Sequence, residues 1–155
     1  MTSIEEIMHT DVVTAEPDES VAAVVGRMRD AGVGAALIVD GGGLRALFTE
    51  RDLLTRVVGD GRDPAGTRVL EVSTEQVVTV SRKTPIRTCA EALKNRKARH
   101  LPVVEDGRPV GIVSARDFFE LLAGRMEGLV DQLRYENQLA AGEDPYDHLG
   151  GSYGR

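Results

Sequence analysis

The sequence predicts an α+β fold built from two copies of one unit. Residues 100–118 contain an apolar run, a turn rich in charge and glycine, a second apolar run and a helix-start signature. The same plan recurs 65 residues earlier, at residues 35–53, with no gap in the alignment. Turn, cap and apolar runs all align at one offset, which chance would rarely produce, so we interpret the chain as a duplicated unit.

Each unit is expected to follow the order strand, helix, strand, strand, helix. In the first unit we expect a short helix within residues 1–12, a strand at 12–15, helices at 21–30 and 50–58, and hairpin strands at 35–39 and 44–48. The run Pro17 to Ser20 starts the first long helix, and Gly32 and Gly34 end it. Residues Asp40 to Gly43 form the hairpin turn.

The second unit repeats this pattern after a linker at residues 59–66. Its helix has the same i, i+3, i+4, i+7 apolar face, formed by Ile86, Cys89, Ala90 and Leu93 where the first unit has Val21, Val24, Val25 and Met28. We expect a short helix at 67–72, an early strand at 77–80 and a final helix that continues to about Ala140. An apolar stripe follows that helix through Phe118, Leu122, Met126, Leu129 and Leu133. The glycine-rich tail from Ala141 is expected to be mobile.

Composition excludes several classes of protein. Hydrophobic residues make up 41% and charged residues 28% of the 155, as in ordinary globular proteins. The longest apolar runs fall far short of the roughly 20 residues that a membrane span needs. The N-terminal residues lack a basic region followed by an apolar core, so we expect no secretory signal and a cytoplasmic location. A single cysteine, Cys89, excludes an intrachain disulfide and a cysteine-rich metal site, and we expect it to be a small buried residue.

The two units differ in charge. The whole chain has a net charge of −6, which argues against general affinity for nucleic acid. Residues 82–117 contain nine Lys and Arg against four Asp and Glu, whereas residues 17–52 contain four against six. Solvated helix faces account for part of this difference. They account less well for Arg96, Lys97, Arg99 and His100, because this run leads directly into a strand.

Taken together, the repeated motifs resemble the CBS domain, the unit named after cystathionine β-synthase, and two such units resemble a Bateman module. The resemblance rests on the early Val-Val-Thr of each unit, the hairpin, and the hydrophobic run that ends in Thr or Ser-x-x-Asp. Residues 99–104, Arg-His-Leu-Pro-Val-Val, and 111–117, Gly-Ile-Val-Ser-Ala-Arg-Asp, are especially similar to the family pattern, as is Gly61 to Pro64 in the linker. Where the family often has a Met-Thr pair just before the early strand, the first unit has Met8-His9 and the second has Ser73-Thr74.

The resemblance implies tandem CBS domains, two βαββα units in a pseudo-twofold arrangement, with an extended C-terminal helix. We assign the first CBS domain to residues 5–60, a linker and short helix to 61–71, the second CBS domain to 72–123, and a helix extension with a mobile tail to 124–155. It also implies a homodimer, and a ligand such as AMP, ADP, ATP or S-adenosylmethionine bound in the cleft between the units. We expect no required cofactor and no bound metal.

Family residues carry over to positions of this chain as follows. The early strands and the hairpin starts would enclose the base, through Val13, Thr14, Val78, Thr79, Ala35, His100, Leu101 and Pro102. Thr49, Asp52, Ser114 and Asp117 would contact ribose and phosphate, because a carboxylate accepts two hydrogen bonds from vicinal hydroxyls and a helix start presents N–H groups to an anion. Arg99, His100 and Arg116 are candidates for the phosphate contacts.

Alternatives remain for these residues. Thr49 to Asp52 and Ser114 to Asp117 are also ordinary capping boxes, and His100 is also compatible with a purely structural role in its strand. Where the second unit has Arg96, Lys97, Arg99 and His100, the first has Ala31, Gly32, Gly34 and Ala35. We therefore expect residues of the second unit to hold the phosphate end of a ligand, and the first site to prefer a less charged ligand or to remain empty.

Three functions compete. The leading hypothesis is a stand-alone regulatory module that binds an adenosyl ligand and signals to an unidentified partner protein by a change of shape. The alternative is a ligand-independent interaction or scaffold protein that uses the long C-terminal helix. An enzyme is disfavoured, because the sequence shows no nucleophile–base–acid set, metal cluster or Gly-x-x-x-x-Gly-Lys loop. Nucleic acid is an unlikely partner given the acidity, and no membrane partner is expected.

Overall fold

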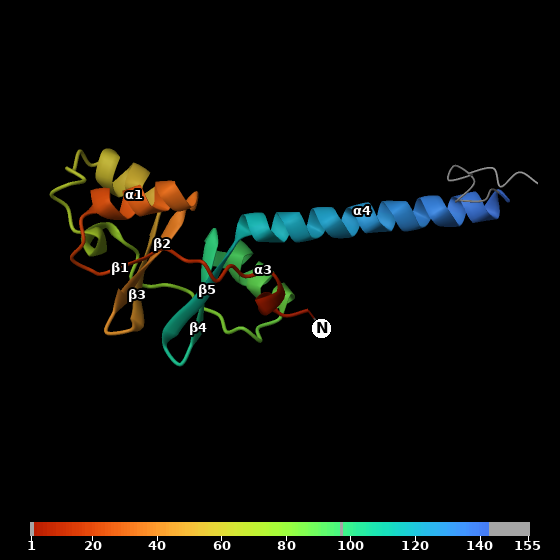
Figure 1. Ribbon diagram of the computed structural model, residues 1–155, viewed down its shortest axis with the longest axis horizontal. Coiled ribbons are helices and arrows are strands. Elements are labelled where there is room, and N and C mark those ends of the chain that lie inside the picture. The colour runs from red at the N-terminus through yellow and green to blue at the C-terminus, as the bar shows by residue number, and fades with distance from the viewer. Residues whose placement is uncertain (1, 97, 143–155) are drawn as a thin grey trace, which may run out of the picture. The chain divides into compact units, whose positions relative to one another are not determined.

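The computed structural model describes residues 2–96 and 98–142, and it divides at Asp117 into a first unit and the helical remainder. The tail expected to be mobile therefore lies, from residue 143 on, outside the described residues. In chain order the helices and strands are β1 (Thr14–Ala15), α1 (Val21–Ala31), β2 (Ala35–Asp40), β3 (Gly43–Thr49), α2 (Glu50–Asp52), α3 (Ile86–Arg96), β4 (His100–Glu105), β5 (Arg108–Ser114) and α4 (Ala115–Ala140) (Figure 1). The predicted α+β class and the duplicated plan are confirmed.

Two antiparallel hairpins, β2–β3 and β4–β5, form the sheets of the two halves. Both turn through two residues with positive φ, Gly41-Gly42 at 58° and 83° and Asp106-Gly107 at 51° and 77°. Positive φ at both turn positions is the geometry that glycine and aspartate tolerate best and that matches strand twist. The ladders shift register at equivalent places, between Ile38 and Val39 and between Val103 and Val104, so the repeat extends to this irregularity.

A helix packs on each hairpin, and the predicted apolar face is buried more completely in α1 than in α3, where Ile86 and Leu93 are half-buried and Ala90 is exposed. The Ser20 hydroxyl accepts a hydrogen bond from Ala23 N at 3.2 Å and caps α1, which ends at Gly32 with φ 67°. The buried residues of α1 join those of the β1–β3 sheet in one core, formed by Ala15, Val21, Val24, Met28, Ala36, Ile38, Ala46, Phe48, Val57, Val69 and Val72. In the second half Cys89 of α3 is fully buried, and burial raises the pKa of its thiol.

The segment before each unit packs on the opposite half of the repeat. Ile4 N donates to Thr84 O at 2.9 Å, and His9 and Ile112 exchange two backbone hydrogen bonds of 2.9 Å. Sixty-five residues later Val69 N donates to Glu19 O at 2.8 Å, and Thr74 and Leu47 exchange two bonds of 2.9 Å. We call residues 4–9 and 69–74 the two leader segments. Ile4 and Val69 are both fully buried. The leader that precedes the first half therefore packs on the second half, and the leader that precedes the second half packs on the first.

The leaders are shorter helices than expected. The helix predicted within residues 1–12 is a 3₁₀ turn at Ile4–Glu6, and the one predicted at 67–72 is a 3₁₀ turn at Val69–Val72. Each leader becomes extended at its end, because His9 and Thr74 form β-bridges to the hairpins. A continued helix would direct those backbone groups along its own axis and lose the bridges.

The helix expected at 50–58 is also irregular. Only Glu50–Asp52 is α-helical in this stretch, and Leu53–Val58 is a π-helical segment. The Thr55 hydroxyl donates to Arg51 O at 2.7 Å and competes for an α-helical acceptor. Gly59 N donates to Leu54 O at 2.8 Å, and a Cβ at Gly59 would lie 2.7 Å from Thr55 O, so glycine is required to close this turn.

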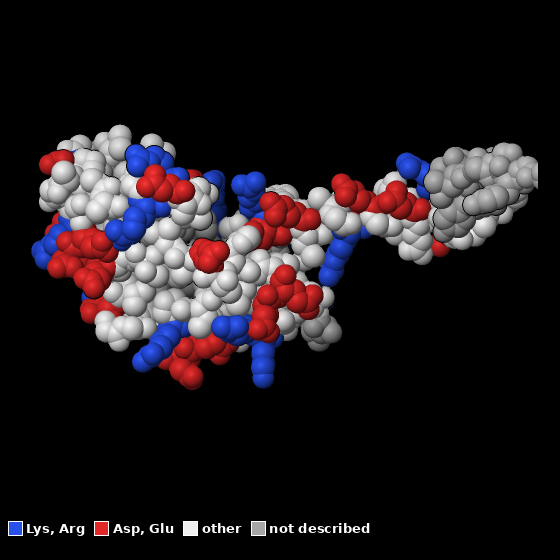
Figure 2. Space-filling view, viewed as in Figure 1, with Lys and Arg blue, Asp and Glu red and all other residues white. Residues whose placement is uncertain are grey.

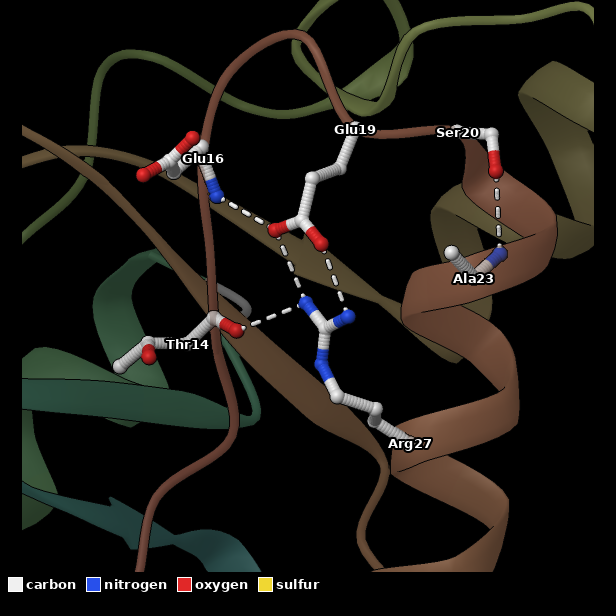
Figure 3. Close-up of polar contacts among 6 residues, drawn as sticks. All are labelled: Thr14, Glu16, Glu19, Ser20, Ala23 and Arg27. Atoms are coloured by element: carbon white, nitrogen blue, oxygen red, sulfur yellow. Dashed lines mark hydrogen bonds and ion pairs between the residues drawn. The ribbon is translucent and has the colours of Figure 1, made fainter.

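The early strand predicted at 77–80 does not form among the described residues. Its position makes one parallel bridge, Val80 to Val103, where the first half has the strand β1 on β2. Figure 3 shows a contact between α1 and β1: Arg27 donates to Thr14 O at 3.0 Å and forms a forked pair with Glu19 at 2.8 and 2.9 Å. The residue equivalent to Arg27 is Ala92, which has no group to donate. The second half therefore lacks this link between helix and early strand.

Several charged side chains among the described residues form local ion pairs. Acidic and basic groups are interspersed among uncharged ones on the face drawn in Figure 2. Within the window that carries excess positive charge, Arg82 pairs with Glu5 at 3.3 Å and Arg87 with Glu91 at 3.3 Å. The excess of Lys and Arg in the second half is thus partly neutralised at the surface.

Helix α4 runs to Ala140, as predicted. Its apolar stripe is exposed, with exposed fractions of 56% for Leu122, 65% for Met126 and 55% for Leu129. Leu122 is the repeat counterpart of Val57, which is fully buried, so the two halves diverge at this position. Among the described residues no helix combines the length and apolar character that crossing a membrane requires.

The Arg27 link yields a prediction. Replacing Arg27 by Gln should lower the free energy of unfolding at pH 7 by up to about 1 kcal/mol, the usual value for a partly exposed ion pair. The hydrogen bond from Arg27 is the main cause that lowers the pKa of Glu19 below 4.5, so this contribution is present above pH 4.5 and is lost as pH falls through the lowered pKa. Urea unfolding at pH 7 and in acid measures both effects.

Arg29→Gln is the matched control, because Arg29 pairs only with its exposed neighbour Asp30 in the contacts described, and both side chains are more than 70% exposed. Hydrogen exchange of residues 13–16 should accelerate in Arg27→Gln and not in Arg29→Gln. Equal exchange in the two variants would show that Arg27 does not hold β1.

Candidate functional site

A cleft of about 370 Å³ lies between the two halves of the first unit. Its lining combines the cap of the first half with the strand start of the second: Gly34, Leu47, Thr49, Glu50, Arg51, Asp52, Thr74, Gln76, Val77, Val78, Ala98, Arg99 and His100. The cap residues and Arg51 come from the end of β3 and from α2, and Arg99 and His100 come from the segment that opens β4. Leader residue Thr74 completes the wall, because its bridge to Leu47 holds it against β3.

The Thr49–Asp52 cap fixes a carboxylate at the cleft. Asp52 Oδ2 accepts hydrogen bonds from Thr49 N at 3.0 Å and from Thr49 Oγ1 at 3.3 Å, and its other oxygen, Oδ1, lies 3.6 Å from Arg56 Nε. Asp52 is 7% exposed. The predicted capping box is therefore present, and the same carboxylate lines the cleft, so the two interpretations of this motif are compatible.

His100 brings a half-buried imidazole to the cleft. Burial lowers the pKa of His100, while the carboxylates of Glu50 and Asp117 act in the opposite direction and Arg99 adds to the lowering. A lowered pKa favours the neutral ring, which offers one donor and one acceptor. The backbone of this segment is fixed by Arg99 O, which accepts from Ala115 N at 2.8 Å.

Both signs of charge meet at the cleft. Arg51 and Arg99 are exposed cations in its lining, and the carboxylate of Glu50 lies over Gly34, where an added Cβ would come within 3.0 Å of Glu50 Cδ. Apolar surface comes from Leu47, Val77 and Val78. Such a site combines an apolar wall with a few placed polar groups, as small-molecule sites usually do.

The second cap repeats the first, with a different partner for the outer carboxylate oxygen. Asp117 Oδ2 accepts from Ser114 N at 2.7 Å and from Ser114 Oγ at 3.1 Å, and Asp117 is 7% exposed. Its other oxygen, Oδ1, lies 2.7 Å from His9 Nε2. Leader residue His9 thus contacts the carboxylate of the second cap. In the first half the equivalent carboxylate, Asp52, and the equivalent leader residue, Thr74, both line the cleft.

The cleft contains five of the site residues proposed from the sequence: Thr49, Asp52, Val78, Arg99 and His100. The remaining ones lie elsewhere. Ala35, Leu101 and Pro102 are buried in their strands, Val13 is half-buried against the first core, Thr14 and Thr79 are exposed, Arg116 is exposed, and Ser114 and Asp117 form the second cap. Lys97 and the side chain of Arg96 lie outside the described residues.

The cleft also includes residues that the sequence pattern did not single out. Glu50 and Arg51 lie inside the capping motif, and their place between Thr49 and Asp52 was the available signal. Thr74 and Gln76 precede the early segment of the second half and carried no such signal, because their position depends on the bridge to Leu47. From sequence, the basic residues were grouped with the cap of their own unit. In the structure, Arg99 and His100 of the second half line the same cleft as the first half's cap. Among the described residues no group of three or more His, Cys, Asp or Glu side chains could hold a metal ion.

The lowered pKa of His100 predicts a pH effect on stability. Since the folded chain holds His100 below its ordinary value of 6.5, the unfolded chain binds more protons as pH falls below 6.5. Wild type should therefore lose stability relative to His100→Gln between pH 7 and pH 5, and the two should differ by a constant amount above pH 7. Urea unfolding at four pH values measures this, and a constant difference over the whole range would contradict it.

Comparisons with known proteins agree on one family. The model of the CBS domain matches residues 4–59 and 69–124. The protein MK0525 of Methanopyrus kandleri is 29% identical over 77% of this chain, and the match spans 62% of that protein's length. The CBS domain-containing protein YhcV of Bacillus subtilis is 30% identical over 76% of this chain and 83% of its own.

A solved structure shows the same fold. The CBS domain pair of protein MJ0100, in complex with 5′-methylthioadenosine and S-adenosyl-L-methionine, superposes with a TM-score of 0.74 at 24% identity, over 81% of this chain and 98% of that one. Two matched copies of the family model, offset by the 65 residues that separate the two caps, account for the hairpins, α1, α2, α3, both leaders and the start of α4. The chain belongs to the CBS-domain family and contains a pair of CBS domains.

Proposed function

We propose that this CBS pair is a regulatory module that binds an adenine nucleotide or S-adenosylmethionine in the cleft and signals to a partner protein. The observation that carries the proposal is the meeting of the Thr49–Asp52 cap with Arg99 and His100 around one cleft of about 370 Å³. That volume falls within the range of small-molecule sites, roughly 300–1,000 Å³.

Each part of an adenosyl ligand has a matching group in the cleft. Asp52 Oδ1 would accept a ribose hydroxyl, because Oδ2 is already held by Thr49. Leu47, Val77 and Val78 supply apolar surface for the base. Arg51 and Arg99 would bind phosphate, and Glu50 suits the positive charge of a sulfonium or amino group. The mixture of charges supports both ligand types.

The likeness to MJ0100, at 24% identity, concerns the fold. Its complex shows that a CBS pair can hold adenosyl ligands, which makes that ligand class the first to test. Ligand binding would alter the angle between the two halves, and the response can be no larger than the difference in affinity between the two shapes.

The proposal also covers oligomeric state, location and the absence of catalysis. We propose a homodimer located in the cytoplasm, with no required cofactor and no bound metal, and a regulatory role in place of catalysis. Light scattering after gel filtration tests the dimer. Interspersed charges on the face in Figure 2 and the net charge of −6 give no support to binding of nucleic acid. The alternative of a ligand-independent scaffold that uses α4 is not favoured, because the family match ends at residue 124.

A ligand screen followed by two variants tests the function. Thermal shift against AMP, ADP, ATP and S-adenosylmethionine should identify a ligand, since one present at 100 times its Kd adds about 2.7 kcal/mol of stability. Asp52→Ala should then weaken binding at the cleft by about 10- to 100-fold, the cost of one or two hydrogen bonds to a charged group. Isothermal titration calorimetry measures the loss.

Asp117→Ala is the matched control, because it removes the equivalent cap from the other half and costs a similar amount of helix stability. The two variants should lose affinity unequally, with Asp52→Ala losing more. Equal losses would contradict the asymmetry between the two caps, and no stabilisation by any of the four compounds would contradict the ligand class.

A further inference from the structure

The two caps of the repeat differ in the partner of one carboxylate oxygen: Asp52 Oδ1 lies 3.6 Å from Arg56 Nε, beyond hydrogen-bond distance, whereas Asp117 Oδ1 has a close partner from a leader segment. Asp117 Oδ1 lies 2.7 Å from His9 Nε2, and the residue equivalent to His9 is Thr74, which lines the cleft. Both leader residues are held in the same way, by paired backbone bonds of 2.9 Å to Ile112 and to Leu47. The backbone therefore presents His9 and Thr74 from equivalent positions. Whether a leader contacts the neighbouring cap carboxylate then depends on the side chain at that position.

His9 occupies the part of the second carboxylate that a ligand would need. Asp117 Oδ2 is already held by Ser114, just as Asp52 Oδ2 is held by Thr49. The remaining oxygen of Asp117 is hydrogen-bonded to the imidazole at 2.7 Å, whereas the remaining oxygen of Asp52 has only the longer ion-pair contact of 3.6 Å to exposed Arg56 among the contacts described. Threonine at position 74 has too short a side chain to span the same gap to Asp52, and no hydrogen bond or ion pair between the two is described.

The second cap keeps Arg116 at the position of Arg51, but it lacks counterparts of Arg99 and His100. By the symmetry of the repeat, the segment that corresponds to Ala98–His100 is Val33–Ala35, which carries no charged side chain. A ligand at Asp117 would find neither an Arg nor a His at those positions. The contact of His9 with Asp117 and the uncharged Val33–Ala35 segment both disfavour a ligand at the second cap, and they involve different residues.

We propose that His9 acts as a built-in occupant of the second nucleoside site, so that each chain binds one ligand, at the Asp52 cleft. This inference rests on the proposed function. The imidazole takes the place of a ribose hydroxyl on Asp117, and because the His9 side chain is 63% exposed, it can be removed without opening a core. The identity of one leader residue then sets the number of ligands per chain.

Exchange of the two leader residues tests the inference. His9→Thr gives the second site the residue found at the first, and Thr74→His gives the first site the residue found at the second. Calorimetry with AMP and with S-adenosylmethionine, together with equilibrium dialysis, counts ligands per chain. Wild type should bind one, His9→Thr should bind two, and Thr74→His should weaken the wild-type site at least tenfold. His9→Ala serves as a second variant if His9→Thr does not fold.

The outcomes separate this inference from the proposed function. Two ligands per wild-type chain, or one ligand per chain in both folded His9 variants, would overturn the role of His9 and leave the function intact. Absence of binding by wild type and by every variant would overturn the function and this inference with it. Two ligands per chain in a His9 variant and one per chain in wild type would establish the role of His9.

Discussion

The pairing of each leader with the opposite hairpin is the constraint on which the rest of the molecule depends. The bridges His9–Ile112 and Thr74–Leu47 connect segments that are far apart in the chain, and they bring fully buried Ile4 and Val69 into cores that they could not otherwise reach. Neither half is complete without a segment that precedes the other in sequence. Since Thr74 is fixed by the same bridge, the wall of the cleft follows directly from this exchange.

Duplication supplies two equivalent frames, and small differences in side chains give them different properties. Arg27 holds β1 against α1, whereas Ala92 leaves the corresponding segment with one bridge to β4. Arg99 and His100 supply positive charge and an imidazole where Gly34 and Ala35 supply backbone and a methyl group. His9 contacts one cap, and Thr74 leaves the other accessible to the cleft. The hairpin backbones stay symmetric down to their register shifts, whereas the early strand and the helix after the cap differ between the halves.

The hairpins, the long helices and the end of α4 were predictable from sequence because local signals determine them. Glycine and aspartate at positive φ mark the turns, and i, i+3, i+4 spacing marks the buried faces. The early strand predicted at 77–80 does not form: this segment keeps one bridge, Val80 to Val103, and the residue that corresponds to Arg27 is Ala92, which cannot make the same contact. The π-helical turn after Asp52 depends on one hydroxyl and one glycine, Thr55 and Gly59, which no periodicity reveals. The sequence motifs that line the cleft could be predicted. The meeting of the first half's cap with Arg99 and His100 of the second half could not, because it depends on how the two halves pair in three dimensions.

Burial of Cys89 has a consequence of its own. It is the single thiol of the sequence, it belongs to the helix of the second half, and burial holds its pKa above the ordinary value. Only the thiolate reacts readily with alkylating or oxidising reagents, so the native chain shields its one reactive sulfur. The first half carries no such group, and the rate at which Cys89 is labelled therefore reports transient opening of one half of the duplicated fold without interference from the other.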